Sequence, residues 1–99
     1  MLIAFAAMLL QGSMVESIAT DEALRTCFKL ASDDALLRDV KPEAYPAFLQ
    51  KICGPARDAW MKAKDAADGD DADPEGTFYA ARSRFEAAAA EYAKRHSSK

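Results

Sequence analysis

Apolar residues recur every three or four positions over most of the chain, which is the spacing of amphipathic helices. The first such stretch covers residues 20–31. Its apolar positions are Leu24, Cys27, Phe28, Leu30 and Ala31. The polar triplet at residues 32–34 predicts an interruption. A short helical continuation over residues 35–40 would then place Leu36, Leu37 and Val40 over the core.

Prolines at positions 42 and 46 predict a turn over residues 41–46, because proline fixes its own φ and disfavours a helical conformation in the residue before it. A second helix is expected from there to Asp68. Its apolar phase continues through Gly54 and Pro55, which predicts one kinked helix rather than two. The apolar positions are Phe48, Leu49, Ile52, Cys53, Ala56, Trp60, Ala63 and Ala67.

Residues 68–73 are predicted to form a loop, and Asp73, Pro74 and Glu75 then read as a helix start, with a capping aspartate and proline at the first helical position. One face of the last helix carries Phe78, Ala81, Phe85, Ala88 and Tyr92. Its alanine run at 87–90 favours the helix and allows a neighbouring helix to approach closely. No stretch alternates apolar and polar residues for long enough to predict a strand. The chain is therefore expected to be all-α, a small antiparallel helical bundle of three main helices.

The two cysteines, Cys27 and Cys53, lie 26 positions apart on the first two predicted helices. Folding back at the proline turn would bring the sulfurs together, so a disulfide between the helices is expected. Closing a loop of this length stabilises a chain by roughly 3 to 4 kcal/mol. Two reduced core thiols are the alternative in a cytosolic protein. A redox or metal role is disfavoured, because there is no Cys-x-x-Cys and the one histidine lies at the far terminus.

The start of the chain resembles a targeting segment. Residues 2–10 form an uncharged apolar run, and Ser17, Ile18 and Ala19 have the small-residue spacing that signal peptidase recognises. This predicts a signal peptide over residues 1–19, a single helical domain over residues 20–99, and a periplasmic or secreted location. No basic residue precedes the run, so an apolar helix that stays attached is the alternative. The run is shorter than the about 20 residues of a membrane span, and no membrane association is expected after cleavage.

Charge and motif content argue against several functions. The formal net charge is −3, and the basic residues are scattered rather than clustered, which argues against nucleic acid and against an anionic membrane surface. Neither a phosphate-binding glycine loop nor a nucleophile elbow is present, and His96 lies in the last turn of the last predicted helix, where the chain is expected to fray. A non-enzymatic protein without catalytic residues or cofactors is expected. The acidic run at 65–75 fits neither register of an EF-hand, so it predicts a solvated loop rather than a metal site.

Three side chains fall off the main apolar stripes and are candidates for contact with a protein partner: Tyr45, Met61 and Tyr79. Tyrosine is enriched at binding hot spots, while Phe48 and Trp60 recur at core spacing and are expected to pack inside. The sequence thus favours a protein- or peptide-binding module whose partner is unknown.

One local pattern is shared with a known group of proteins. It consists of Trp60, then Lys64-Asp65-Ala66, and later Gly76-Thr77 before a final helix. This resembles the Trp-x-x-x-Arg-Asp-Ala and Gly-Gly-Ser/Thr pattern of small secreted bacterial domains of the lysozyme-inhibitor type, over about residues 57 to 95. The chain departs from that pattern at three positions and lacks a cysteine in the last helix; the positions are Arg57 for Gln, Lys64 for Arg, and Asp68 near an expected cysteine.

The resemblance implies an alternative function, inhibition of a cell-wall hydrolase of the lysozyme type, in which the acidic loop would complement a basic enzyme. A second alternative, a cytosolic helical regulatory protein, applies if residues 1–19 stay attached.

Overall fold

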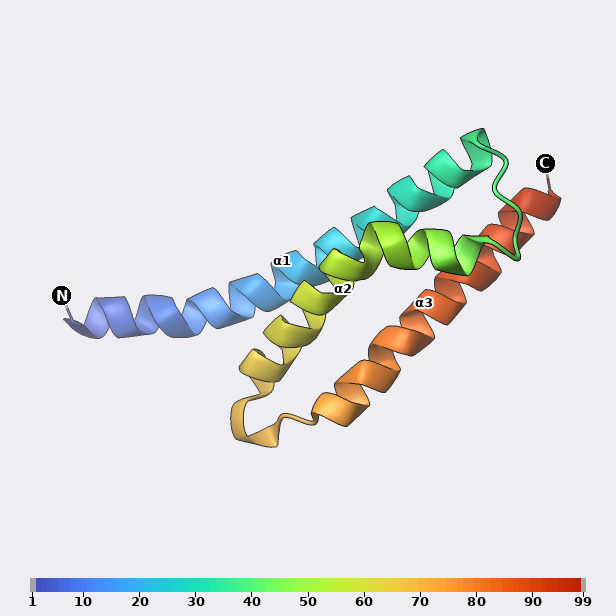
Figure 1. Ribbon diagram of the computed structural model, residues 1–99. Helices are drawn as coiled ribbons and strands as arrows, with labels where there is room; N and C mark the ends of the chain where they lie inside the picture. Colours follow the sequence, from blue (N-terminus) through green and yellow to red (C-terminus); the bar gives the residue numbers. More distant parts are fainter. Residues whose placement is uncertain (1, 99) are drawn as a thin grey trace.

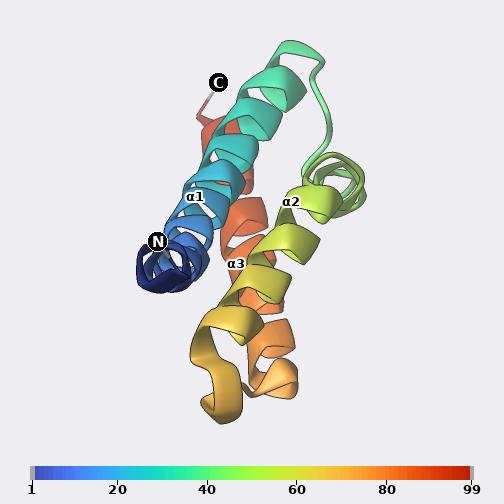
Figure 2. The same ribbon diagram turned by 90° about the vertical axis from the view of Figure 1, so that its left-hand side faces the viewer.

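A computed structural model describes the backbone of residues 2–98 and the side chains of residues 14–98. Three long helices make up the fold: α1 (Leu2–Leu37), α2 (Tyr45–Asp68) and α3 (Pro74–Ser97), with a short 3₁₀ turn, η1 (Gly69–Asp71), between the last two. α2 runs back along the second half of α1, and α3 runs back along α2 (Figures 1 and 2). The predicted all-α bundle of three main helices is confirmed. The side chains of the apolar run at 2–10 lie outside the described residues.

α1 runs without a break through residues 32–34, so the predicted interruption is wrong. Asp34 pairs with Arg38 one turn later, and Arg95 of α3 contacts both Ser32 and Asp33. Polar side chains such as serine and aspartate can interrupt a helix when they hydrogen-bond to backbone groups and so compete with the hydrogen bonds of the helix. Here each has a side-chain partner, and the helix continues.

α2 continues through Pro55, as predicted from the unbroken apolar phase, and has Pro46 in its first turn. Proline has no N–H to give to the carbonyl of Lys51 one turn earlier, and its ring crowds that carbonyl. The helix bends at this point (Figure 1). Cys53 lies just before the bend, on the side that faces α1.

The core lies where α2 faces α1 and α3. Its buried members are Leu24, Ala31, Ala35, Tyr45, Leu49, Cys53, Phe85 and Tyr92. Phe28 of α1 meets Phe85 of α3 edge to face, with 5.1 Å between ring centroids. The rings of Tyr45 and Tyr92 stack at 3.9 Å. These aromatic contacts join all three helices.

Four large apolar residues expected inside are exposed. Leu30, Leu37, Ile52 and Phe78 have exposed fractions of 61%, 88%, 42% and 53%. Leu37 is the last residue of α1, and its side chain lies in solvent. Leu30 and Ile52 line an open surface beside Cys27. Phe78 belongs to the end of the bundle where α2 and α3 pack as a pair, and a pair of helices covers less of each other's surface than three do.

The start of α3 follows its sequence signature. Asp73 caps the helix by accepting a hydrogen bond from the backbone N–H of Gly76 at 3.1 Å, which confirms the predicted cap. The buried hydroxyl of Thr77 donates to Asp65 of α2 at 2.7 Å. At the end of α2, a hydrogen bond from Lys64 to Asp68 and the charge of that carboxylate raise the pKa of the lysine.

Candidate binding groove

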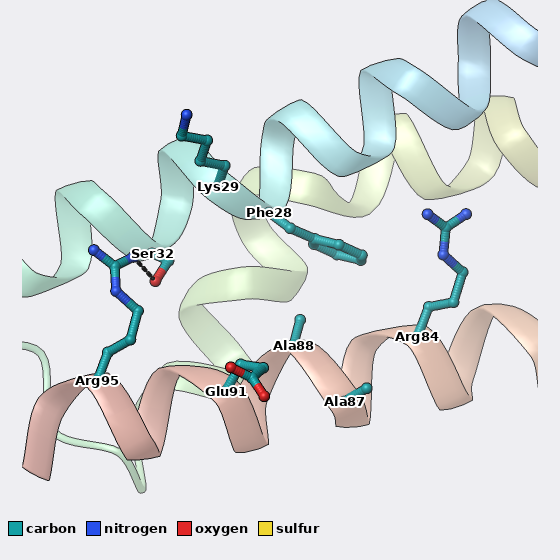
Figure 3. Close-up of a pocket in the computed structure, with 8 residues that line it drawn as sticks. All are labelled: Phe28, Lys29, Ser32, Arg84, Ala87, Ala88, Glu91 and Arg95. Carbon is teal, nitrogen blue, oxygen red and sulfur yellow. Dashed lines mark hydrogen bonds between the residues drawn. The ribbon is translucent and has the colours of Figure 1, made fainter.

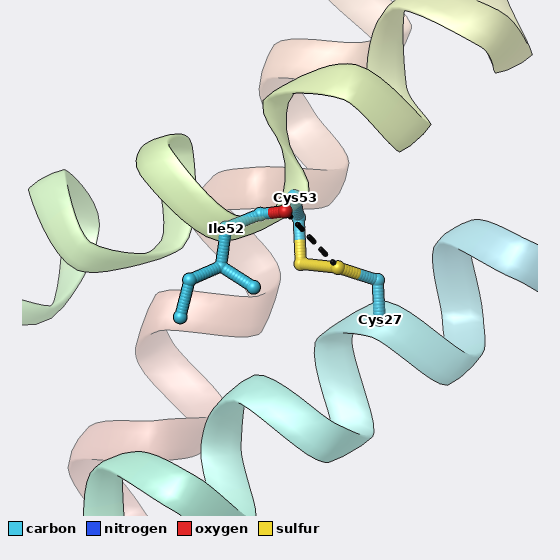
Figure 4. The surroundings of a disulfide bond; sticks show 3 residues. All are labelled: Cys27, Ile52 and Cys53. Carbon is cyan, nitrogen blue, oxygen red and sulfur yellow. Dashed lines mark hydrogen bonds between the residues drawn. A yellow bond between two sulfur atoms is a disulfide. The ribbon is translucent and has the colours of Figure 1, made fainter.

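The disulfide joins the two helices that the sequence predicted. Cys27 of α1 and Cys53 of α2 are bonded, with their Cα atoms 5.8 Å apart, and the prediction is confirmed. The sulfur of Cys27 also lies 3.7 Å from the carbonyl oxygen of Ile52 (Figure 4). A bonded sulfur has no hydrogen to donate, so this approach is a packing contact. A structural disulfide indicates an environment outside the reducing cytosol.

A groove lies between α1 and α3. Both helices pack on α2 and touch each other little, which leaves an open space with a cavity volume of about 420 Å³. Eight residues line it: Phe28, Lys29, Ser32, Arg84, Ala87, Ala88, Glu91 and Arg95. Figure 3 shows the Phe28 ring reaching from α1 toward α3, with arginines at both ends of the groove. We call this the α1/α3 groove.

Arg84 stands at one end of the α1/α3 groove and is fixed by three neighbours. Its Nη1 donates to Asp21 of α1 at 2.8 Å. Its guanidinium lies 5.9 Å from the ring centroid of Phe28 and 5.2 Å from that of Trp60. Stacking on aromatic faces and pairing with a carboxylate together hold the planar group in one orientation.

Arg95 stands at the other end and contacts α1 one helical turn beyond Phe28. Its Nη1 donates to the hydroxyl of Ser32 at 2.6 Å and lies 3.0 Å from Asp33 (Figure 3). Beneath Ser32 lies the buried hydroxyl of Tyr45, which has no hydrogen-bond partner among the described residues. Burial raises the pKa of the Tyr45 phenol and the nearby Tyr92 adds to this, while a weak interaction with the Ser32 hydroxyl, outside ordinary hydrogen-bond geometry, and the positive charge of Arg95 oppose it.

The lining of the α1/α3 groove holds more cations than carboxylates, in contrast to the chain as a whole. Lys29, Arg84 and Arg95 line it against Glu91 alone, while Asp21 and Asp33 beside it pair with Arg84 and Arg95. The whole chain has a formal net charge of −3. The surroundings of the groove therefore favour an anionic ligand, although the protein as a whole does not.

A narrower groove lies on the other side of α3, against α2. It consists of two adjoining hollows of about 220 and 260 Å³ that share Gln50, Arg82 and Phe85. The two arginines of this groove already have partners: Arg82 pairs with Glu86 at 3.1 Å, and Arg57 contacts both Asp58 and Gln50. This groove offers an apolar surface with less unbalanced charge.

The three predicted partner contacts lie in different places, and none of them lines the α1/α3 groove. Tyr45 is 1% exposed, so the expectation that it lies off the core is wrong: its ring fills the space between Tyr92 and Phe48. Met61 is half-buried. Tyr79 is exposed and packs edge to face on Phe78, with 5.8 Å between ring centroids.

No other chemical site stands out in the described part of the chain. Among residues 14–98, no group of three or more histidine, cysteine or acidic side chains is placed to hold a metal ion. Within the same residues, none of the helices has a stretch long and apolar enough to cross a membrane. His96 packs against the ring of Tyr92 and contacts Asp39 at 2.9 Å, at the end of the bundle away from the cysteines.

Comparison with known proteins adds no assignment: no family model, no characterised protein and no solved structure matches the chain.

The groove was not predicted from the sequence, although the sequence contains part of its signal. Arg84, Ala87, Ala88, Glu91 and Arg95 follow one another at steps of one, three or four residues, so they share one face of α3. The alanine run was expected to let another helix approach. The sequence alone does not show that α1 stays apart from this face.

Proposed function

We propose that the protein is a non-enzymatic exported protein of the bacterial periplasm that binds a protein or peptide in the α1/α3 groove. Export rests on the disulfide and on the signal-like start, and binding rests on the groove. The observation that carries the proposal is the basic, apolar-floored groove in a chain that is otherwise acidic.

Cleavage before Thr20 is compatible with the packing of α1. Three apolar residues ahead of that point, Met14, Val15 and Ile18, are each more than 60% exposed. The first buried residue among those described is Leu24. Removal of residues 1–19 would therefore take away exposed apolar surface and leave the core, the disulfide and the Asp21–Arg84 contact in place.

Expression of the full chain in a Gram-negative host, followed by fractionation, tests the location. We expect the protein in the periplasmic fraction with Thr20 at its N-terminus. A pull-down from periplasmic extract tests binding, with a photoreactive amino acid at position 87 in the groove and at position 90 on the solvent side of the same helix. Crosslinks at 87 but not at 90 are expected. An extract in which no site on the protein captures a partner would contradict the proposal.

Inhibition of a lysozyme-type hydrolase is the second candidate. It is favoured by one contact: the hydrogen bond between Asp65 and Thr77 joins the two parts of the sequence pattern that resembles such inhibitors. The acidic turn beside it exposes Asp70 and Asp71, which could face a basic enzyme. Undiminished lysozyme activity at about micromolar protein would remove this candidate. Recovery of an uncleaved chain from the cytosol would instead favour a cytosolic regulatory protein.

A further inference from the structure

The α1/α3 groove is long enough to receive about three turns of a helix. Arg84 and Arg95 are eleven residues apart on α3, which spans about 16 Å or three helical turns. α1 and α3 both lie against α2, and the α1/α3 groove opens between them (Figure 3). In four-helix bundles this position is occupied by the fourth helix.

The floor of the groove suits a helix better than an extended peptide. Ala87 and Ala88 present methyl groups only, so a neighbouring helix axis can approach to about 8 Å, and Phe28 provides an apolar surface between the arginines. The walls are α-helices, whose backbone groups are already hydrogen-bonded within the helix. An added strand would find no sheet edge to pair with, whereas a helix brings its own backbone bonds.

The two arginines fix the charge of the occupant. Arg84 uses Nη1 for Asp21, and Arg95 uses Nη1 for Ser32 and Asp33. Among the described residues, their Nε and Nη2 groups make no hydrogen bond, so each guanidinium can donate to a further carboxylate. Both are held in position by their existing contacts, which lowers the entropy lost when a ligand binds.

We infer that the α1/α3 groove receives an amphipathic helix with acidic flanks from a partner protein, which completes a four-helix bundle. This inference rests on the proposed binding function and names the class of partner. The apolar face of the incoming helix packs on Phe28 and the two alanines. Carboxylates about three turns apart on that helix pair with Arg84 and Arg95.

A pair of synthetic peptides tests the charge preference. Each is capped at both ends and about 18 residues long, or five helical turns, with leucines on one face. One carries glutamate beside the leucine face and the other carries lysine at the same positions. Trp60 is the only tryptophan of the chain and touches Arg84, so its fluorescence reports binding in the groove. We expect the glutamate peptide to bind about tenfold more tightly, and more weakly as salt is raised.

Two variants with the same added charge test the location. Ala87→Glu places a carboxylate in the groove, whereas Ala90→Glu places it on the solvent side of the same alanine run; both positions are exposed, and far-ultraviolet circular dichroism checks that both variants fold. Ala87→Glu should weaken binding of the glutamate peptide about tenfold, and Ala90→Glu should leave it within about twofold.

Several outcomes would overturn the inference. These are equal binding of the two peptides, an equal effect of the two variants, or no binding of the glutamate peptide. Self-association of the wild-type protein that Ala87→Glu abolishes would assign the groove to a second copy of the chain. A periplasmic partner that crosslinks at Tyr79 and not at position 87 would leave the binding function standing and remove this groove as its site.

Discussion

The two stacked tyrosines of the core differ in what their hydroxyls contact, and this predicts opposite effects of the same substitution. The hydroxyl of Tyr92 donates to the backbone carbonyl of Val40 at 2.6 Å, while the hydroxyl of Tyr45 is buried without a partner among the described residues. Replacement of tyrosine by phenylalanine removes one oxygen from either ring and leaves the stack in place.

The magnitudes follow from the cost of burying polar groups. Tyr92→Phe leaves the Val40 carbonyl without its donor and should lower the free energy of unfolding by about 1 to 2 kcal/mol. Tyr45→Phe removes a buried hydroxyl whose desolvation is offset at most by a weak interaction with the Ser32 side chain, and should raise the free energy of unfolding by up to about 1 kcal/mol. For a domain of this size, each kcal/mol shifts the melting temperature by about 4 to 8 °C.

Urea unfolding of the oxidised protein, followed by circular dichroism, measures both free energies. The matched control is the double variant, whose free energy should fall close to the wild-type value if the two hydroxyls act independently. A Tyr45→Phe variant destabilised as much as Tyr92→Phe would refute the reasoning. In that case a buried water or the Ser32 side chain satisfies the Tyr45 hydroxyl.

Replacing Cys27 and Cys53 together by serine should lower the free energy of unfolding by about 3 to 4 kcal/mol relative to the oxidised wild type, measured by urea titration, and the reduced wild type should match the variant; a loss below about 1 kcal/mol would contradict a stabilising role of the disulfide. Asp73→Ala should cost about 1 kcal/mol, because the first turn of α3 loses its capping acceptor, and an unchanged melting temperature would show that the cap is dispensable. Burial raises the pKa of the phenols of both Tyr92 and Tyr45. At Tyr92 the charge of Asp39 adds to this shift and that of Arg95 opposes it. The unfolded chain therefore ionises first, so stability should be constant below the ordinary phenol pKa of 10.0 and fall as pH rises through the raised values. A melting temperature that stays level across this range would contradict the burial of both phenols.

The elements that local patterns determine were predictable from the sequence. The start of α3 depends on a capping aspartate, Asp73, and on Pro74, which both act within one helical turn. The kinked α2 was predictable because the spacing of its apolar residues is the same before and after Pro55. The disulfide required only that two helices fold back on each other. These features involve neighbours in sequence or a single long-range pairing, and periodicity captures both.

The features that were mispredicted depend on which helices meet. Tyr45 was placed outside because it was read as lying off the main apolar stripes, yet Tyr92, a long way along the chain, covers its ring. Phe78 shares the apolar face of α3, but the helix that would cover it does not reach that end of the bundle. The α1/α3 groove arises from a separation between two helices that the periodicity of either helix does not encode.

The intact mass of the protein recovered from the periplasm tests the central claim most directly. The account predicts a chain that begins at Thr20, weighs two hydrogens less than its reduced form, and has no thiol that reacts before reductant is added. A chain that retains Met1 and carries two reactive thiols at Cys27 and Cys53 would contradict the account.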